Sequence, residues 1–178
     1  MENYDVVIVG AGASGIGIGA MLKDFGVENM VILEREQVGS TFDKWPKEMQ
    51  LITPSFTTNF WGQIDLNSVV SGTSPAFSLE TEHPTGKEYA KYLRLISDHF
   101  ELPIKEYTNV EEVIYSQECF TIHTSEGLII KSRFMIWAAG EFQYPNTDSF
   151  SGSQLCLHHS QVKTWKPFPY TPLHPPTK

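Results

Sequence analysis

The sequence predicts an α/β fold in which a parallel β-α-β sheet carries a small antiparallel β insertion. A short β-branched run near the N-terminus ends in a cluster of glycines, and a helical stretch and a second apolar run follow it. Between residues 104 and 130, short β-branched segments alternate with turn residues, as in an antiparallel sheet. With 178 residues, of which 40% are hydrophobic, the chain can form one substantial core, so we expect a single domain over residues 1–165.

The N-terminal β-α-β unit consists of three elements. They are a strand from Tyr4 to Val9, a helix from Ser14 to about Phe25 and a strand from Met30 to Leu33. The first strand is a β-branched apolar run, which is typical of a parallel strand buried on both faces. Gly26 tolerates the left-handed conformation that ends many helices. Glycines 15, 17 and 19 each cost the helix roughly 1 kcal/mol against alanine, so we expect close packing against the sheet to compensate.

From residue 36 to residue 84 the periodicity weakens, and three X-Pro pairs interrupt every candidate helix. These pairs are Trp45-Pro46, Thr53-Pro54 and Ser74-Pro75. We therefore expect a long, partly irregular excursion. Order returns at Thr85, which forms a Thr-x-x-Glu capping box with Glu88. Apolar residues then recur at helical spacing as far as Phe100, and Pro103 ends the pattern, so a helix with one face on the core is predicted.

Several short strands are expected in the second half of the chain. Those assigned to the antiparallel insertion are Ile104 to Tyr107, Val110 to Tyr115, Phe120 to Thr124 and Leu128 to Ile130. Ser125-Glu126-Gly127 is typical of a hairpin turn. The apolar run from Phe134 to Trp137 predicts a central strand that rejoins the first sheet and ends at Ala138-Ala139-Gly140. Five prolines between Pro167 and Pro176 predict a disordered tail over residues 166–178.

The composition argues against several classes of partner. A formal net charge of -8 and a pI near 5.2 oppose attraction to nucleic acid or to anionic lipid. No apolar segment reaches the roughly 20 residues needed to cross a bilayer, and the N-terminus has no basic signal region, so we expect a cytoplasmic protein without membrane contact. Cys119 and Cys156 form no Cys-x-x-Cys motif, and the pair His158-His159 has no further ligand nearby, so neither a disulfide nor a metal site is expected.

The glycine cluster carries the main functional signal. Residues 10–15 match G-x-G-x-x-G between a strand and a helix, and Glu34 lies 19 residues after the third glycine. Gly10 permits the sharp turn, Gly12 lets the backbone approach a pyrophosphate, and Gly15 lets the helix lie close to the strand. Glu34 accepts hydrogen bonds from ribose hydroxyls and repels a 2′-phosphate. The pattern therefore predicts a Rossmann-like site for FAD or NAD rather than NADP. The alternative is a simple tight turn followed by a solvated acid.

Beyond this unit, four stretches resemble flavin-containing monooxygenase-like proteins, which are flavoproteins with two dinucleotide-binding domains. The stretches are VVIVGAGASGIGIG, VILEREQVGSTFDKWP, MQLITPSFTTNF and FMIWAAGEFQYP. They are similar to the FAD fingerprint, the Glu-x4-Gly-Gly segment, the loop near the isoalloxazine ring and the Ala-Thr-Gly strand end of that family. Ser40 stands where the family has its second glycine, and Ala139 where it has threonine. The resemblance runs from about residue 3 to residue 165 and implies FAD as the cofactor.

The resemblance also implies which residues contact FAD. They are Gly10, Gly12, Ala13, Ser14, Gly15, Glu34, Arg35, Ser40 and Thr41, with the adenine near Val110 and the nucleotide near Ala139 and Gly140. In complete relatives, NADPH bound to a second domain reduces the flavin, which then reacts with O2 and oxygenates a small substrate. Here the proline-rich tail follows the pair His159-Ser160, so we expect the FAD-binding portion of an oxidoreductase, truncated before the NADPH domain. The resemblance names no catalytic base, because the cofactor carries the chemistry.

Two alternatives to a monooxygenase-like function stay open. One is a flavin-dependent reductase of disulfides or of another acceptor, which the lack of a cysteine pair disfavours. The other is a truncated, non-catalytic nucleotide-binding fragment. The aromatic residues of the excursion either close over the core or face the flavin, and packing is the commoner role of such residues. The residues in question are Trp45, Phe56, Phe60 and Trp61, together with Asn59.

Overall fold

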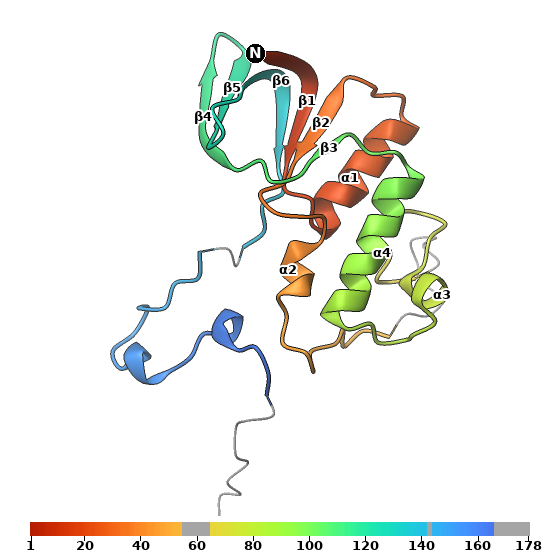
Figure 1. Cartoon of the computed structure of the whole chain (residues 1–178), viewed down its shortest axis with the longest axis vertical. Coiled ribbons are helices and arrows are strands. Elements are labelled where there is room, and N and C mark those ends of the chain that lie inside the picture. The colour runs from red at the N-terminus through yellow and green to blue at the C-terminus, as the bar shows by residue number, and fades with distance from the viewer. Residues whose placement is uncertain (55–64, 142–143, 166–178) are drawn as a thin grey trace, which may run out of the picture.

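The computed structural model describes residues 1–54, 65–141 and 144–165 of the chain. The described residues form a six-stranded sheet with helices packed on one of its faces (Figure 1). No helix among them is long and apolar enough to span a membrane. The predictions for Phe56, Asn59, Phe60 and Trp61, and for the tail from residue 166 onward, lie outside the described residues.

The parallel part of the sheet contains the predicted β-α-β unit. Its strands are β1 (Glu2–Val9), β2 (Met30–Leu33), β3 (Ile104–Lys105) and β6 (Ile129–Trp137), and the order in the whole sheet is β3-β2-β1-β6-β5-β4. The assignment of residues 104–107 to the antiparallel insertion is wrong. This segment forms the two-residue strand β3 parallel to β2, because Ile32 donates to the carbonyl of Pro103 and Glu34 to that of Lys105.

The antiparallel part is continuous with the parallel part. Strands β4 (Val110–Ser116) and β5 (Cys119–Thr124) pair with each other, and β5 pairs with the first half of β6. The hairpin turn before β6 is confirmed, with Gly127 at a φ of 78° and its amide bonded to the carbonyl of Thr124. Residues 128–130 and 134–137 are not separate strands, however. One strand runs through both segments because Ser132 is buried between them.

Helices α1 (Ala13–Asp24) and α4 (Gly86–His99) confirm the two main helical predictions. The Thr85 hydroxyl accepts from the amide of Glu88, and the Glu88 carboxylate accepts from that of Thr85, so the capping box is present. The excursion also contains the short helices α2 (Ser40–Asp43) and α3 (Pro75–Leu79), with two 3-10 turns later in the chain. Ser74-Pro75 therefore does not break a helix. It begins one, because the Ser74 side chain caps the amide of Phe77 and proline occupies the first turn.

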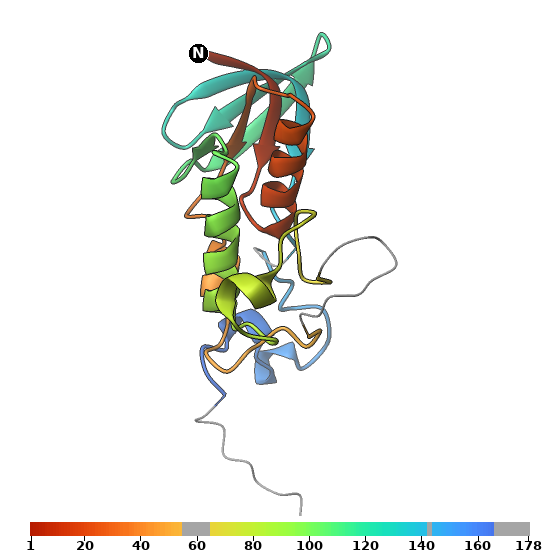
Figure 2. The same cartoon turned by 90° about the vertical axis from the view of Figure 1, so that its right-hand side faces the viewer.

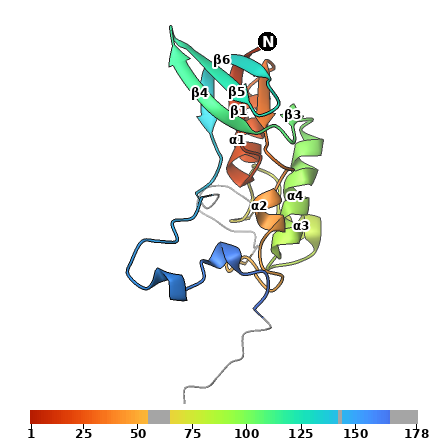
Figure 3. The same cartoon turned by 60° about the vertical axis from the view of Figure 1, so that its left-hand side comes forward.

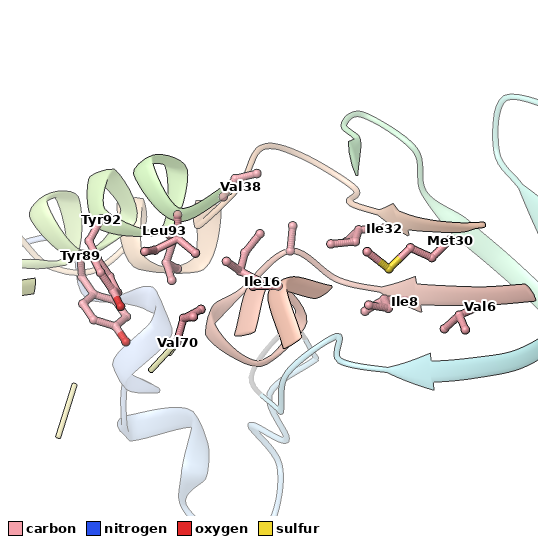
Figure 4. Packing of buried hydrophobic residues seen from close by; sticks show 13 residues of the cluster. Val6, Ile8, Ile16, Met30, Ile32, Val38, Val70, Tyr89, Tyr92 and Leu93 are labelled. Carbon is pink, nitrogen blue, oxygen red and sulfur yellow. The ribbon is translucent and has the colours of Figure 1, made fainter. Parts of the chain in front are cut away.

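Apolar clusters lie on both faces of the sheet. Figure 2 views the molecule from the side on which α1 and α4 lie. Alternate residues of β1 and β2 face opposite sides. On one side, Val6, Ile8 and Ile32 pack with residues from α1 and α4, including Ile16 and Leu93 (Figure 4). The residues of the second cluster, on the other side, are Val7, Val9, Val31, Leu33, Ile122 and Ile130. The curled antiparallel strands therefore cover the face that the helices leave open.

The glycines of α1 pack closely, as their cost in helix propensity led us to expect. A β-carbon on Gly17 would lie 2.7 Å from the carbonyl oxygen of Val69, and one on Gly19 would lie 2.7 Å from Cδ1 of Ile32. Both distances are far below the roughly 3.5 Å of an ordinary contact. Gly19 therefore lets the helix lie against β2, as expected, whereas Gly17 lets it lie against the backbone of the excursion at Val69.

Candidate nucleotide-binding site

Three parallel strands end side by side at the N-terminus of α1. Gly10 follows β1, Glu34 follows β2 and Ala138 follows β6. The amide of Gly10 donates to the carbonyl of Leu33 at 2.8 Å, and the amide of Ala138 donates to that of Val9 at 2.8 Å. These two hydrogen bonds continue the ladders beyond the strands, so the backbone segments after all three strands have fixed relative positions. In open α/β sheets, ligands bind at this carboxyl edge.

Gly10 and Gly15 are needed for the shape of the turn. Gly10 has a φ of +105°, and a β-carbon there would lie 2.4 Å from the carbonyl oxygen of Ala138. A β-carbon on Gly15 would lie 1.8 Å from the carbonyl oxygen of Gly10. Any side chain at either position would therefore push apart the strand end and the helix.

Gly12 has a different environment. No atom lies within 4 Å of the position that its β-carbon would take, so the turn is open at this point. The fold therefore does not require glycine at residue 12 for packing. A ligand that approaches the backbone would occupy the same space.

The N-terminus of α1 presents amides to this open space. Gly12 is the N-cap residue and provides no side-chain acceptor, and the first turn contains no acidic residue. Ile16 donates to the carbonyl of Gly12 at 3.0 Å, while Ala13 and Ser14 precede the first intrahelical donor. Ser14 is exposed and Ala13 is half-buried. Free amides and the positive end of the helix dipole together favour an anion here.

Glu34 lies directly against the glycine turn. Its Oε2 accepts from the amide of Ala11 at 2.7 Å, and its Oε1 accepts from the amide of Glu36 at 2.8 Å. The backbone carbonyl of Glu34 also accepts from Thr108 at 2.8 Å, so both ends of the residue are held. A carboxylate has about four acceptor positions, and two backbone donors leave the others available for hydroxyl groups. The arrangement suits recognition of a ribose.

The residues after Glu34 are placed differently from one another. Ser40 is half-buried and Thr41 exposed in α2, which Gly39 joins to the turn by donating to the carbonyl of Ala11 at 3.0 Å. The structure therefore brings Ser40 and Thr41 to the site. The side chain of Arg35 is exposed and its nearest ionic partner is Glu36 at 4.0 Å, so no contact fixes it toward the turn.

The remaining predicted contacts come from later strands. The Cα of Ala139 lies 3.1 Å from the position of a β-carbon on Gly10, so Ala139 lines the turn, and Gly140 follows with a φ of 78°. Val110 begins β4 and packs against the cluster that contains Val9 and Leu33, on the face of the sheet away from α1. Val110 is therefore brought near the ends of β1 and β2, but no hydrogen bond connects it to the glycine turn among the described residues.

Two roles at the site were not predicted, that of Ala11 within the glycine motif and that of Glu106. Ala11 contributes only backbone atoms, which connect Glu34 to Gly39, and its side chain carries no signal of that role. Glu106, one residue after β3, accepts from the amide of Val38 at 2.9 Å and so fastens the segment that leads to α2. An acid directly after a parallel strand, as at Glu34, is the signal that could have identified it.

Comparison with known proteins places this geometry in context. Residues 7–173 match the family described as pyridine nucleotide-disulphide oxidoreductase. Two curated relatives, each named uncharacterized oxidoreductase CzcO, come from Bacillus velezensis and Bacillus subtilis. Each is 28% identical to this chain; the matches cover 90% and 94% of this chain but only 44% and 46% of the relatives. The chain thus spans less than half the length of these relatives.

Solved structures share the fold. A bacillithiol disulfide reductase from Staphylococcus aureus has a TM-score of 0.72 at 21% identity, covering 87% of this chain and 44% of its own. A flavin monooxygenase variant from Stenotrophomonas maltophilia has a TM-score of 0.73 at 22% identity, covering 92% of this chain and 47% of its own. The two TM-scores are nearly equal, so the shape of the backbone does not favour one reaction over the other.

Proposed function

Because this chain belongs to the pyridine nucleotide-disulphide oxidoreductase family, we propose that it binds FAD and forms the FAD-binding portion of a flavin-dependent oxidoreductase. The hydrogen bond from the amide of Ala11 to the Glu34 carboxylate carries this proposal. It puts the acid that would hold a ribose directly beside the turn that would hold a diphosphate.

The chain's residues would bind and orient the cofactor. The amides of Ala13 and Ser14 would donate to the diphosphate in the space that Gly12 leaves open. Glu34 would accept from the ribose hydroxyls with the lone pairs that Ala11 and Glu36 do not use. The residues present therefore fit a dinucleotide.

The finer proposal is a monooxygenase-like enzyme in which NADPH and O2 act on the flavin. Bound FAD would supply two-electron redox chemistry, and the protein would supply position and exclusion of water. A dithiol reductase is less well supported, because Cys119 lies on β5 and Cys156 is a separate exposed residue after a 3-10 turn. The two cysteines belong to different elements, and neither lies in the glycine turn. The segment that delivers hydride would belong to the part of the relatives that this chain does not span.

FAD binding by the purified chain tests the proposal. We expect added FAD to give a yellow protein with visible flavin absorbance after removal of free cofactor. Glu34→Ala is expected to raise the Kd at least about tenfold, since one charge-assisted hydrogen bond contributes about 1.5–3 kcal/mol. Glu36→Ala is the matched control, because the Glu36 side chain pairs with Lys44 on the surface. A colourless wild-type protein, or equal affinity in the two variants, would contradict the proposal.

A further inference from the structure

Tyr107 has a backbone conformation that L-amino acids rarely adopt. Its φ is 54°, in the left-handed region, where the β-carbon comes close to the following carbonyl oxygen. Glycine avoids this contact and asparagine tolerates it, but a bulky aromatic residue there is an outlier. Such strain persists where the surrounding structure enforces it, and it is concentrated at binding and catalytic sites. The conformation of Tyr107 therefore calls for an explanation.

Ordinary turns explain the four other non-glycine residues with a positive φ in the described part of the chain. Glu80 is the C-cap residue of α3, and Glu101 follows the C-cap of α4, where left-handed residues commonly end helices. Gln117 and Glu118 are the two residues between β4 and β5, in a hairpin that favours such angles. Tyr107 neither ends a helix nor closes a hairpin.

Tyr107 lies in the connection from β3 to β4, which is hydrogen-bonded to the segment around Glu34. The amide of Tyr107 donates to the carbonyl of Glu36 at 3.0 Å, and the amide of Thr108 donates to that of Glu34 at 2.8 Å. Figure 3 shows this connection as the green segment that runs from β3 to β4. Tyr107 is thus held one residue from the amide that bonds to Glu34.

The ring of Tyr107 contributes little to the packing of the fold. The residue is 62% exposed and belongs to neither of the two apolar clusters. Glycine at this position would relieve the backbone without opening the core. An exposed aromatic ring, however, presents a flat face on which a nucleobase can stack.

The charges around Tyr107 favour a neutral group at this place. Glu34, Glu36 and Glu106 lie on the two segments that hold the residue, and the ammonium group of Lys44 is paired with Glu36. These carboxylates repel a phosphate, whereas a neutral ring experiences no such repulsion.

The order of the strands also places a base at Tyr107. The glycine turn follows β1, Glu34 follows β2, and Tyr107 comes two residues after β3, which is the next strand outward in the sheet. The ribose of a nucleotide carries the phosphates at one end and the base at the other. A diphosphate at the glycine turn and a ribose at Glu34 therefore leave the base for the end of β3.

We infer that Tyr107 stacks its ring on the adenine base of the bound nucleotide. The inference rests on the proposed function, because the adenine of FAD is attached to the ribose that Glu34 would hold. Affinity for the base accounts for a tyrosine at a position where the backbone alone favours glycine.

Glycine at residue 107 tests the inference, because it removes the strain and the ring together. We expect Tyr107→Gly to raise the Tm of the apoprotein by about 2–4 °C. It should also raise the Kd for FAD about 5- to 150-fold, which is the contribution of one stacked base. Tyr107→Phe keeps the ring and should bind FAD as tightly as wild type. Gln117→Gly is the matched control, since it relieves the same conformation in the β4–β5 hairpin and should raise the Tm without changing the Kd.

ADP is the second probe, because it contains the adenine, the ribose and a diphosphate without the flavin. Calorimetric titration of each variant should show that Tyr107→Gly weakens ADP and FAD by the same factor. Wild-type affinity of Tyr107→Gly for both ligands would overturn the inference and leave the FAD proposal in place. A wild-type chain that binds ADP but not FAD, with ADP weakened in Tyr107→Gly, would do the reverse. A lower Tm in Tyr107→Gly would show that the ring packs within the fold and would overturn the inference, and a wild-type chain that binds neither ligand would overturn both.

Discussion

Alanine at Gly12 is expected to weaken FAD binding while the fold remains, whereas alanine at Gly15 is expected to destabilise the fold. The two residues are three positions apart in one turn, and the structure gives them opposite environments. A β-carbon on Gly12 meets no atom within 4 Å, and one on Gly15 lies 1.8 Å from the carbonyl oxygen of Gly10. The substitutions therefore separate the space for the ligand from the packing of the turn.

The expected magnitudes follow from these distances. At Gly12, with a φ of -80°, alanine is a poorer N-cap by about 0.5–1 kcal/mol but restricts the unfolded chain by a similar amount. The free energy of unfolding should change by less than about 1 kcal/mol. At Gly15, overpacking against a backbone oxygen costs about 3 kcal/mol, of which helix propensity returns about 1 kcal/mol. The net loss of about 2 kcal/mol should lower the Tm by about 4–8 °C.

For FAD affinity we expect the opposite order, with a larger effect of Gly12→Ala than of Gly15→Ala. A methyl group at Gly12 would displace a diphosphate from the helix amides, and losing one charge-assisted hydrogen bond raises the Kd by about 10- to 100-fold. Thermal unfolding of the apoprotein and FAD titration at low temperature measure the two effects separately. A Gly12→Ala protein that binds FAD as tightly as wild type would refute the placement of the diphosphate. A Gly15→Ala protein with an unchanged Tm would refute the packing argument.

Three further predictions concern stability and turnover. The backbone amide and hydroxyl of Thr85 lower the pKa of Glu88 below its ordinary 4.5, so the ionised carboxylate stabilises the fold. In urea unfolding, the difference in the free energy of unfolding between wild type and Glu88→Gln should be full above pH 4.5. It should disappear as the pH falls through the lowered pKa. Asp65→Ala should lower the Tm by about 5–10 °C in calorimetry, because the buried carboxylate accepts from Ser74 Oγ and the amide of Asn67, and each orphaned donor costs about 1–3 kcal/mol. The purified 178-residue chain with FAD should oxidise NADPH at a negligible rate by absorbance, because it spans less than half the length of its relatives, and brisk turnover would contradict the proposal that these residues form only an FAD-binding portion.

Local signals predicted the elements that pack the core. Three such signals act within a few residues, so the sequence shows them directly. They are the continuous apolar character of β1, the glycines on either side of α1 and the Thr85 capping box. The missed elements depend on distant partners. Strand β3 exists because Pro103 and Lys105 accept hydrogen bonds from β2, some 70 residues earlier in the chain. No local pattern distinguishes that pairing from an antiparallel one.

Strand β6 shows a second reason for error. The sequence predicts two separate strands, residues 128–130 and 134–137, and the charged residues Lys131 and Arg133 lie between them. In the structure both charges are exposed, while Ser132 between them is buried and donates to the carbonyl of Asp5 at 3.2 Å. A buried serine that bonds to the neighbouring strand continues the ladder. The polar residues therefore mark the point at which β6 loses its antiparallel neighbour β5 and keeps its parallel neighbour β1.

At the candidate site, some positions require a particular side chain or none, and others contribute only backbone atoms. Three positions need the absence of a side chain, Gly10 and Gly15 for the turn and Gly12 for the ligand, and one position, Glu34, needs a carboxylate. All four residues are present. Of the two substitutions in the family's glycine and threonine positions, Ala139 lies against Gly10 through its Cα, and Ser40 follows Gly39, whose amide bonds to the turn. Such positions tolerate a change of side chain, because the main-chain groups stay in place. A relic that kept the fold would still need Gly10 and Gly15 for the turn and Glu34 for the two amides that it accepts from, whereas nothing in the packing requires glycine at residue 12. The presence of Gly12 therefore favours a working cofactor site over a vestigial fold.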